Sequence, residues 1–208
     1  MSEDFNNIIR EYIDFVNRQV GVYMDALAGF EGHHVSITRQ VHRENRPTNA
    51  GFNEKGEKIV VWTAFEDPSK PDIVISNVRR AKDHIAANAK DGSNTQQHSQ
   101  SVLVFIYSYW EHDIRPRLER AKNDEVLSDL MGDLRFVRHS ILHHKGIMRL
   151  EKNQEFKILG DMFPVNQPIQ IPYENMHRVF VLIKQDCARM LGVPNPETIK
   201  DLAIQRLC

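Results

Sequence analysis

The segment "TQQHSQSVLVFIYSYWEHDIRPRLERA", residues 95–121, predicts a helix at the centre of a helical bundle. Its first half is apolar nearly all round, which is typical of a helix that is covered on every side. Pro116 lies inside the segment and predicts a kink or a break near Arg115, because proline lacks a backbone N–H and crowds the preceding turn.

Two long helices and one short helix are predicted on the C-terminal side of this segment. The first covers residues 123–145, opens at Asn123 or Asp124 and stops at Gly146. Its buried stripe is predicted to be Val126, Leu127, Leu130, Leu134, Val137, Ile141 and Leu142. The proline-marked connection "FPVNQPIQIP" is expected to be extended, and the last long helix then begins at "YENMHR" and ends at Gly192. A short helix is expected after Pro196.

On the N-terminal side, helical spacing of apolar residues predicts a first helix over residues 3–29, with Gly29 and Gly32 as stops. Residues 33–75 are polar and rich in turn formers, followed by β-branched residues, so they are interpreted as an irregular or short-strand insertion. A helix capped by Ser76 or Asn77 should follow. The whole chain, residues 1–208, is therefore expected to be a single, mainly α domain: a bundle of about four to five helices.

The amino-acid composition excludes few classes of function. The 208 residues carry a formal net charge of −1, with 41% hydrophobic and 26% charged residues, as expected of a globular protein. The two cysteines, Cys187 and Cys208, form no disulfide framework and fit a reducing compartment. The longest strongly apolar run, residues 102–107, is too short to cross a bilayer, and the N-terminus has no signal-peptide pattern. A soluble, cytoplasmic protein without a membrane partner is predicted.

Most of the candidate functional residues lie in one stretch, "DLRFVRHSILHHKGI", residues 133–147. Arg138 and His143 are five residues apart, which on a helix is about 140° of rotation and roughly 7.5 Å of rise. Both side chains can therefore reach one cleft near the helix end. Arg135 and His139 lie on the same polar flank, beside the core stripe rather than opposite it.

This stretch resembles a known motif. "RHSILH" is similar to the R-x4-6-H motif of HEPN domains, with Arg138 at the arginine, His139 at the polar second position and His143 at the histidine. "VFIYSYWEHDIRPRL" resembles the preceding HEPN helix, which often carries an acidic residue, and Glu111 matches that residue. The resemblance covers roughly residues 95–192. It implies an HEPN-like bundle that acts as a homodimer, with two motifs meeting in one cleft.

The resemblance also implies an activity: endoribonuclease cleavage that needs no metal and no cofactor. Histidine can exchange protons at the ribose 2′-hydroxyl or at the leaving oxygen, which is the role implied for His143. A guanidinium can pair with the scissile phosphate, which is the role implied for Arg138. His139 would orient these groups, and Glu111 would complete the catalytic set. If Glu111 is buried its carboxylate needs a partner, for which Arg138 is the candidate. Cleavage would leave a 2′,3′-cyclic phosphate and would spare DNA.

RNA is accordingly the expected substrate, bound by residues around the motif and by a basic segment elsewhere. Arg135, His144 and Lys145 flank the motif, and the segment "ITRQVHRENR" supplies Arg39 and Arg43. A solvated loop is the alternative interpretation of that segment. Related nucleases commonly act as toxins or in phage defence, so an antitoxin or regulatory protein is a further expected partner.

Three alternatives stay open. The Arg138–His143 pattern is also compatible with an ordinary helix end, where histidine favours the helix dipole. A non-catalytic HEPN-like module that binds a nucleotide, RNA or a protein would carry the same motif. Finally, His139 and His143 lie four apart on one helical face, as in a two-histidine metal site. A metal-dependent enzyme would then need a third ligand from Glu111, His112 or His177.

Overall fold

The computed structural model describes residues 4–42, 50–67 and 70–193. It is mainly helical, which confirms the mainly α part of the predicted fold class. The chain divides into two compact units, one of residues 1–24 with 98–208 and one of residues 25–97. The single domain over residues 1–208 remains a prediction.

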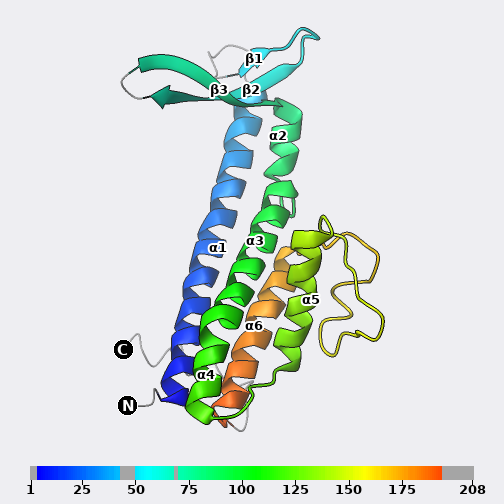
Figure 1. Ribbon diagram of the computed structural model, residues 1–208. Helices are drawn as coiled ribbons and strands as arrows, with labels where there is room; N and C mark the ends of the chain where they lie inside the picture. The colour runs from blue at the N-terminus through cyan, green and yellow to red at the C-terminus, as the bar shows by residue number, and fades with distance from the viewer. Residues whose placement is uncertain (1–3, 43–49, 68–69, 194–208) are drawn as a thin grey trace. The chain divides into compact units, whose positions relative to one another are not determined.

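The elements follow one another along the chain as labelled in Figure 1. They are α1 (Phe5–His42), β1 (Ala50–Phe52), β2 (Lys58–Asp67), β3 (Lys70–Arg80), α2 (Ala81–Ala87), α3 (Ser93–Tyr109), the π-helix η1 (Trp110–Ile114), α4 (Arg115–Lys122), α5 (Asp129–His143) and α6 (Tyr173–Met190). No helix of the described residues is both long enough and apolar enough to cross a membrane.

The larger unit is a helical bundle built around α3, η1 and α4 (Figure 1). Its core contains Ile8, Ile9, Tyr12, Val16, Leu103, Ile106, Trp110, Ile114, Leu118, Leu130, Leu134, Val137, Val179 and Ile183. The Tyr12 ring packs 5.3 Å from the Trp110 ring, and this contact joins the start of α1 to η1. Burial of each large apolar side chain contributes about 1.5–3 kcal/mol, so packing of these faces is the main source of the unit's stability.

The predicted break near Pro116 is confirmed, and its form is a π-helical turn. The Arg115 N–H donates to the Trp110 carbonyl, a bond that spans five residues instead of four. Pro116 cannot donate to the carbonyl four residues before it, and its ring crowds that position. The widened turn from Trp110 to Ile114 therefore precedes the proline, and α4 begins with proline in its first turn.

The first helix is longer than predicted. Its expected stops, Gly29 and Gly32, are exposed residues inside α1, which continues to His42. Neither glycine has the positive φ that ends helices, and a Cβ at either position would meet nothing within 4 Å. A glycine on the exposed face only lowers helix propensity by about 1 kcal/mol, so the helix passes through both.

The predicted start of α5 at Asn123 or Asp124 is wrong. Asn123 instead ends α4 in the left-handed conformation, with φ of 56°. The cap of α5 is Ser128, whose hydroxyl accepts a hydrogen bond from the Met131 N–H at 3.0 Å. Leu127 consequently lies before the helix and is 79% exposed, which removes it from the predicted buried stripe.

The rest of that stripe is confirmed only in part. Val126, Leu130, Leu134 and Val137 are buried, and Ile141 is partly buried. Leu142 is 49% exposed. It lies in the last turn of α5, beside His143 in the sequence, and does not belong to the core.

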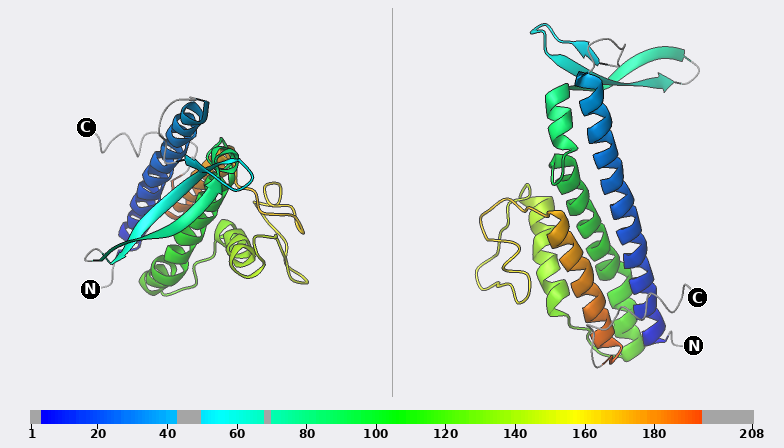
Figure 2. Two further views of the ribbon diagram at one scale, coloured as in Figure 1. Left: turned by 90° about the horizontal axis from the view of Figure 1, so that it is seen from above. Right: turned by 180° about the vertical axis from the view of Figure 1, so that it is seen from behind.

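The smaller unit contains an antiparallel three-stranded sheet in the order β1-β2-β3, seen from two sides in Figure 2. Its core consists of Ile37, Val60 and Ala81, with Val41 and Ile85 packed against it. The predicted helix opening at Ser76 or Asn77 is wrong, because β3 continues to Arg80 and pairs with β2 along almost its whole length. The region interpreted as an insertion, residues 33–75, thus begins inside α1 and ends inside β3.

The connection between α5 and α6 has no helix or strand in residues 144–172, and its proline-marked part, predicted to be extended, contains a turn at residues 165–166. Buried Asp133 of α5 holds it: the carboxylate, 1% exposed, accepts backbone N–H bonds from Lys157, Ile158 and Leu159. The predicted last helix is confirmed as α6, and Gly192 follows it with φ of 71°. The short helix predicted after Pro196, and Cys208, lie outside the described residues.

Candidate functional site

The candidate site lies on the second half of α5 and on the adjoining turn of η1. The Ser128 cap and the buried Leu130, Leu134 and Val137 fix the face that α5 turns toward the bundle. Ser140, fully buried, bonds with both the N–H and the carbonyl of Arg149 and so ties the end of α5 to the chain that leaves it. The predicted flank of Arg135, Arg138, His139 and His143 therefore borders a well-fixed core face.

Arg138 is half-buried and faces Glu111. Its Nη1 lies 3.7 Å from Oε2 of Glu111, and the two side chains are 25% and 27% exposed. The sequence-based expectation that Arg138 is the partner of Glu111 is confirmed by this contact. The distance is longer than a hydrogen bond, so this is a loose ion pair.

Tyr107 completes this part of the site. Its hydroxyl donates to Oε1 of Glu111 at 3.1 Å, and its ring centroid lies 5.9 Å from the Arg138 guanidinium carbon, which suits a cation–π contact. Burial, followed by the Glu111 carboxylate, raises the pKa of Tyr107 to about 12, whereas Arg135 and Arg138 act in the opposite direction. Tyr107 therefore stays protonated and keeps one oxygen of Glu111 in place.

Tyr107 was not predicted as a site residue, since an aromatic residue in an apolar helix is more often core. One signal was available. Tyr107 precedes Glu111 by four residues, the spacing that brings two side chains together on a helix. The π-helical turn that carries Glu111 had no signal apart from Pro116, although such turns are frequent at functional sites.

The histidines gather at the end of the same helix. The ring of His139 lies 4.7 Å from that of His143 and 5.1 Å from that of His144, and all three side chains are exposed. Desolvation, followed by His143 and His144, lowers the pKa of His139. Neutral His139 can then both donate and accept hydrogen bonds beside the other two rings.

The predicted RNA-binding residues divide between the two units. Arg135 is exposed on α5, His144 follows the helix, and exposed Lys145 has φ of 54° in the turn before Gly146. Arg39 is exposed on the part of α1 that belongs to the smaller unit. Arg43 lies outside the described residues. The larger unit by itself thus presents the motif with Arg135, His144 and Lys145.

The metal alternative gains no support from the part of the chain that the structure describes. No group of three or more histidine, cysteine, aspartate or glutamate side chains there is arranged to hold a metal ion. His112 is instead 3.9 Å from Glu111, and His177 on α6 stacks with Tyr173 at 6.2 Å.

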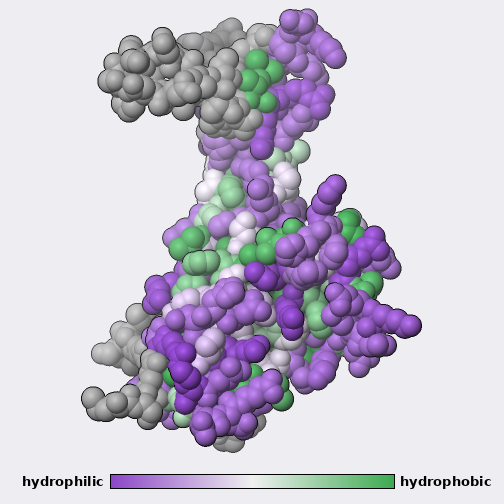
Figure 3. Space-filling view, viewed as in Figure 1, coloured by the Kyte–Doolittle hydropathy of each residue, from purple (hydrophilic) through white to green (hydrophobic). Residues whose placement is uncertain are grey.

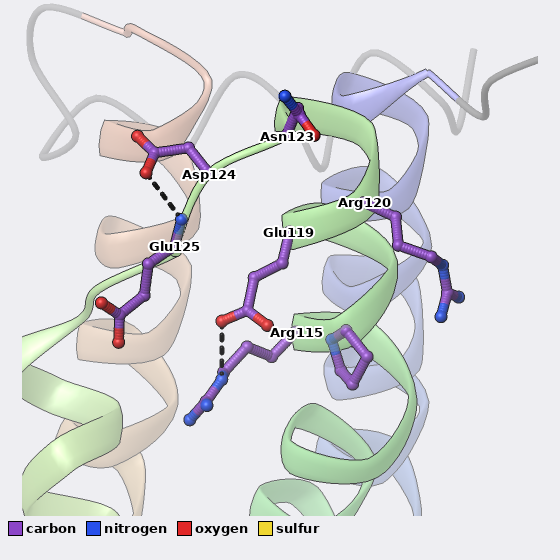
Figure 4. Close-up of a pocket in the computed structure, with 7 residues that line it drawn as sticks. Arg115, Glu119, Arg120, Asn123, Asp124 and Glu125 are labelled. Atoms are coloured by element: carbon purple, nitrogen blue, oxygen red, sulfur yellow. Dashed lines mark hydrogen bonds and ion pairs between the residues drawn. The ribbon is translucent and has the colours of Figure 1, made fainter.

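A shallow pocket of about 680 Å³ lies elsewhere in the bundle, where α4 ends (Figure 4). Arg115, Pro116, Glu119, Arg120, Asn123, Asp124 and Glu125 line it. Arg115 is already paired with Glu119 at 3.0 Å, so the two charges neutralise each other. None of the predicted site residues lines this pocket, and it is not part of the candidate site.

Comparisons with known proteins give this chain no relative. No family model matches it, and neither the curated proteins nor the solved structures contain a significant match.

Proposed function

We propose that this protein is a metal-independent endoribonuclease of HEPN type. The observation that carries the proposal is the half-buried Arg138, held against Glu111 and Tyr107 on the helix that ends in the His139–His143–His144 cluster. A guanidinium for a phosphate and imidazoles for proton transfer are the two kinds of group that cleavage by an internal hydroxyl needs.

In the proposed reaction the ribose 2′-hydroxyl attacks the adjacent phosphorus. One imidazole accepts the hydroxyl proton, and the 5′-oxygen of the next nucleotide leaves with a proton from a second donor. The products are a 2′,3′-cyclic phosphate and a free 5′-hydroxyl. We assign the proton transfer to His143, the phosphate contact to Arg138, and the orientation of the reacting groups to His139.

A second copy of the chain would supply the other proton donor, as the HEPN resemblance implies. Arg135, His144 and Lys145 would extend the contact with the RNA backbone, because salt-dependent contacts with phosphates provide much of RNA affinity. The proposed biological role is toxin-like or defence-related, with an antitoxin or regulatory protein as its control.

A second candidate is a non-catalytic HEPN-like module that binds RNA, a nucleotide or a protein. The ion pair between Arg138 and Glu111 favours it, because the arginine already has a counter-ion without any substrate.

Incubation of labelled RNA with the protein in EDTA separates these candidates. The proposal predicts cleavage by the wild type and loss of cleavage in both Arg138→Ala and His143→Ala. Arg178→Ala and His177→Ala are matched controls, since both residues are exposed on α6, and they should cleave like the wild type. Equal cleavage by all variants would reject the site. RNA binding without cleavage by the dimeric wild type would favour the non-catalytic module.

A further inference from the structure

Arg138 has unused hydrogen-bonding capacity in the free protein. Its Nε–H is buried and has no hydrogen-bond partner among the described residues. Its Nη1 contacts Glu111 only at 3.7 Å. A guanidinium carries five N–H donors in a planar fork that suits two-point binding of a carboxylate or a phosphate.

Another arginine of the same unit, Arg117, is hydrogen-bonded to carboxylates and serves as a comparison. Arg117 donates to both oxygens of Glu11, at 3.0 and 2.6 Å, and also to Asp113 at 2.8 Å. Arg117 is therefore a structural link between α4 and α1. Arg138, in contrast, is held near one carboxylate without being bonded to it.

Glu111 is oriented by contacts other than Arg138. The Tyr107 hydroxyl donates to Oε1 at 3.1 Å, whereas Oε2 is 3.7 Å from Nη1 of Arg138 and 3.9 Å from Nε2 of the exposed His112. This second oxygen is the one that faces the guanidinium. An oxygen of a phosphate bound to this guanidinium would compete with Oε2 for the same positive charge.

We propose that Glu111 acts as a resident anion at Arg138, and that a phosphodiester of single-stranded nucleic acid binds by displacing this carboxylate from the guanidinium. The proposal rests on the proposed function and deepens it: Glu111 positions Arg138 in the free protein and sets how tightly a phosphate is bound. It does not take part in bond cleavage.

The charge of Glu111 must then oppose phosphate binding, because two anions that share one cation repel each other. Glu111→Gln removes this charge at nearly constant shape. Its amide oxygen can still accept a hydrogen bond from the Tyr107 hydroxyl, so the local packing is retained. Glu111→Gln should bind a phosphodiester chain about three- to ten-fold more tightly than the wild type. A residue with a merely structural role would give weaker binding when replaced.

The test is the affinity for a short single-stranded DNA oligonucleotide of mixed sequence, measured by fluorescence anisotropy at fixed ionic strength. DNA lacks the 2′-hydroxyl, so binding is measured without cleavage. The variants are Glu111→Gln, Glu111→Ala as a second removal of the charge, and the double variant Glu111→Gln/Arg138→Ala. Glu119→Gln is the matched control, since it removes the carboxylate of another arginine pair, that with Arg115.

Tighter binding by both single Glu111 variants, abolished in the double variant and absent in Glu119→Gln, is the expected result. Unchanged or weaker binding by the folded Glu111 variants overturns the proposal, and so does an equal gain in Glu119→Gln or no measurable binding by any variant. The two experiments can fail independently. If the Glu111 variants bind DNA like the wild type, this proposal fails, but Arg138 and His143 can still be required for RNA cleavage. If the wild type does not cleave RNA, the proposed function fails, but the measured DNA affinities are unaffected.

Discussion

Glu111 and Arg138 belong to different helices and are 27 positions apart in the sequence, yet Nη1 of Arg138 lies 3.7 Å from Oε2 of Glu111. Glu111 comes from the π-helical turn before Pro116, and Arg138 comes from the middle of α5. The contact joins η1 to the helix that ends in the cluster of histidines.

RNA cleavage should depend on the planar shape of the Arg138 guanidinium and not on its charge alone. Lysine at this position keeps the charge but loses the fork of donors and the flat face that lies over Tyr107. We expect Arg138→Lys to lower the rate of RNA cleavage by about 10²-fold, measured under single-turnover conditions. Arg178→Lys, on an exposed pair of α6, is the control and should be unaffected. A fully active Arg138→Lys would show that only the charge is needed.

Glu11 should stabilise the bundle in a pH-dependent way. Its hydrogen bonds with Arg117, and then with Tyr109, lower its pKa from 4.5 to about 2. The folded pKa is below the unfolded one, so the contribution is fully present above pH 4.5 and is lost as the pH falls toward 2.

We therefore expect Glu11→Gln to lower the free energy of unfolding at pH 7. The expected loss is about 1 to 2 kcal/mol, after a discount for solvent screening of a side chain that is 42% exposed. Urea unfolding of both proteins at several pH values measures it. The difference between them should shrink below pH 4.5; a difference that does not depend on pH would contradict the assignment.

Asp133 should be essential for the order of the connection between α5 and α6. Asp133→Ala removes the acceptor of three buried or half-buried backbone N–H groups and should cost about 3 kcal/mol of stability. Hydrogen exchange at the amides of Ile158 and Leu159 should rise strongly. Asp129→Ala is the control: Asp129 contacts the same segment through the exposed Lys157 side chain, and its removal should leave these amides protected.

Metal removal should leave activity unchanged. The proposed chemistry uses only side chains, so the rate of RNA cleavage after dialysis against EDTA should equal that before it. Activity lost in EDTA and restored by one divalent cation would instead return His139 and His143 to the role of metal ligands. Metal analysis of the purified protein provides an independent check.

Much of the fold could be predicted from the sequence because it depends on side-chain periodicity. The bundle, the break at Pro116, the connection without a helix before α6, and α6 itself all follow from apolar spacing or from proline. The pairing of Glu111 with Arg138 could be predicted for a related reason: a half-buried carboxylate needs a partner, and Arg138 lies on the polar flank of a core helix.

Other features depend on backbone geometry that residue types leave ambiguous. Asn123 is favoured both as an N-cap and in the left-handed conformation after a helix, and the structure uses the second. Gly29 and Gly32 end a helix only where the backbone turns to positive φ, which the composition does not reveal. The surface of the bundle seen in Figure 3 is mostly hydrophilic, with small hydrophobic patches. Because single exposed apolar residues are common on protein surfaces, the spacing of apolar residues could not show that Leu142 is exposed.

The 3′ end that cleavage leaves on the RNA tests the central claim most directly. The fragments should be produced by the wild type in EDTA and analysed by mass spectrometry, with His143→Ala treated in parallel. We predict 2′,3′-cyclic phosphate ends from the wild type and no fragments from His143→Ala. Fragments that end in a 3′-hydroxyl, equal fragmentation by the variant, or an intact RNA with the dimeric wild type would contradict the assignment of Arg138 and His143 as a ribonuclease site.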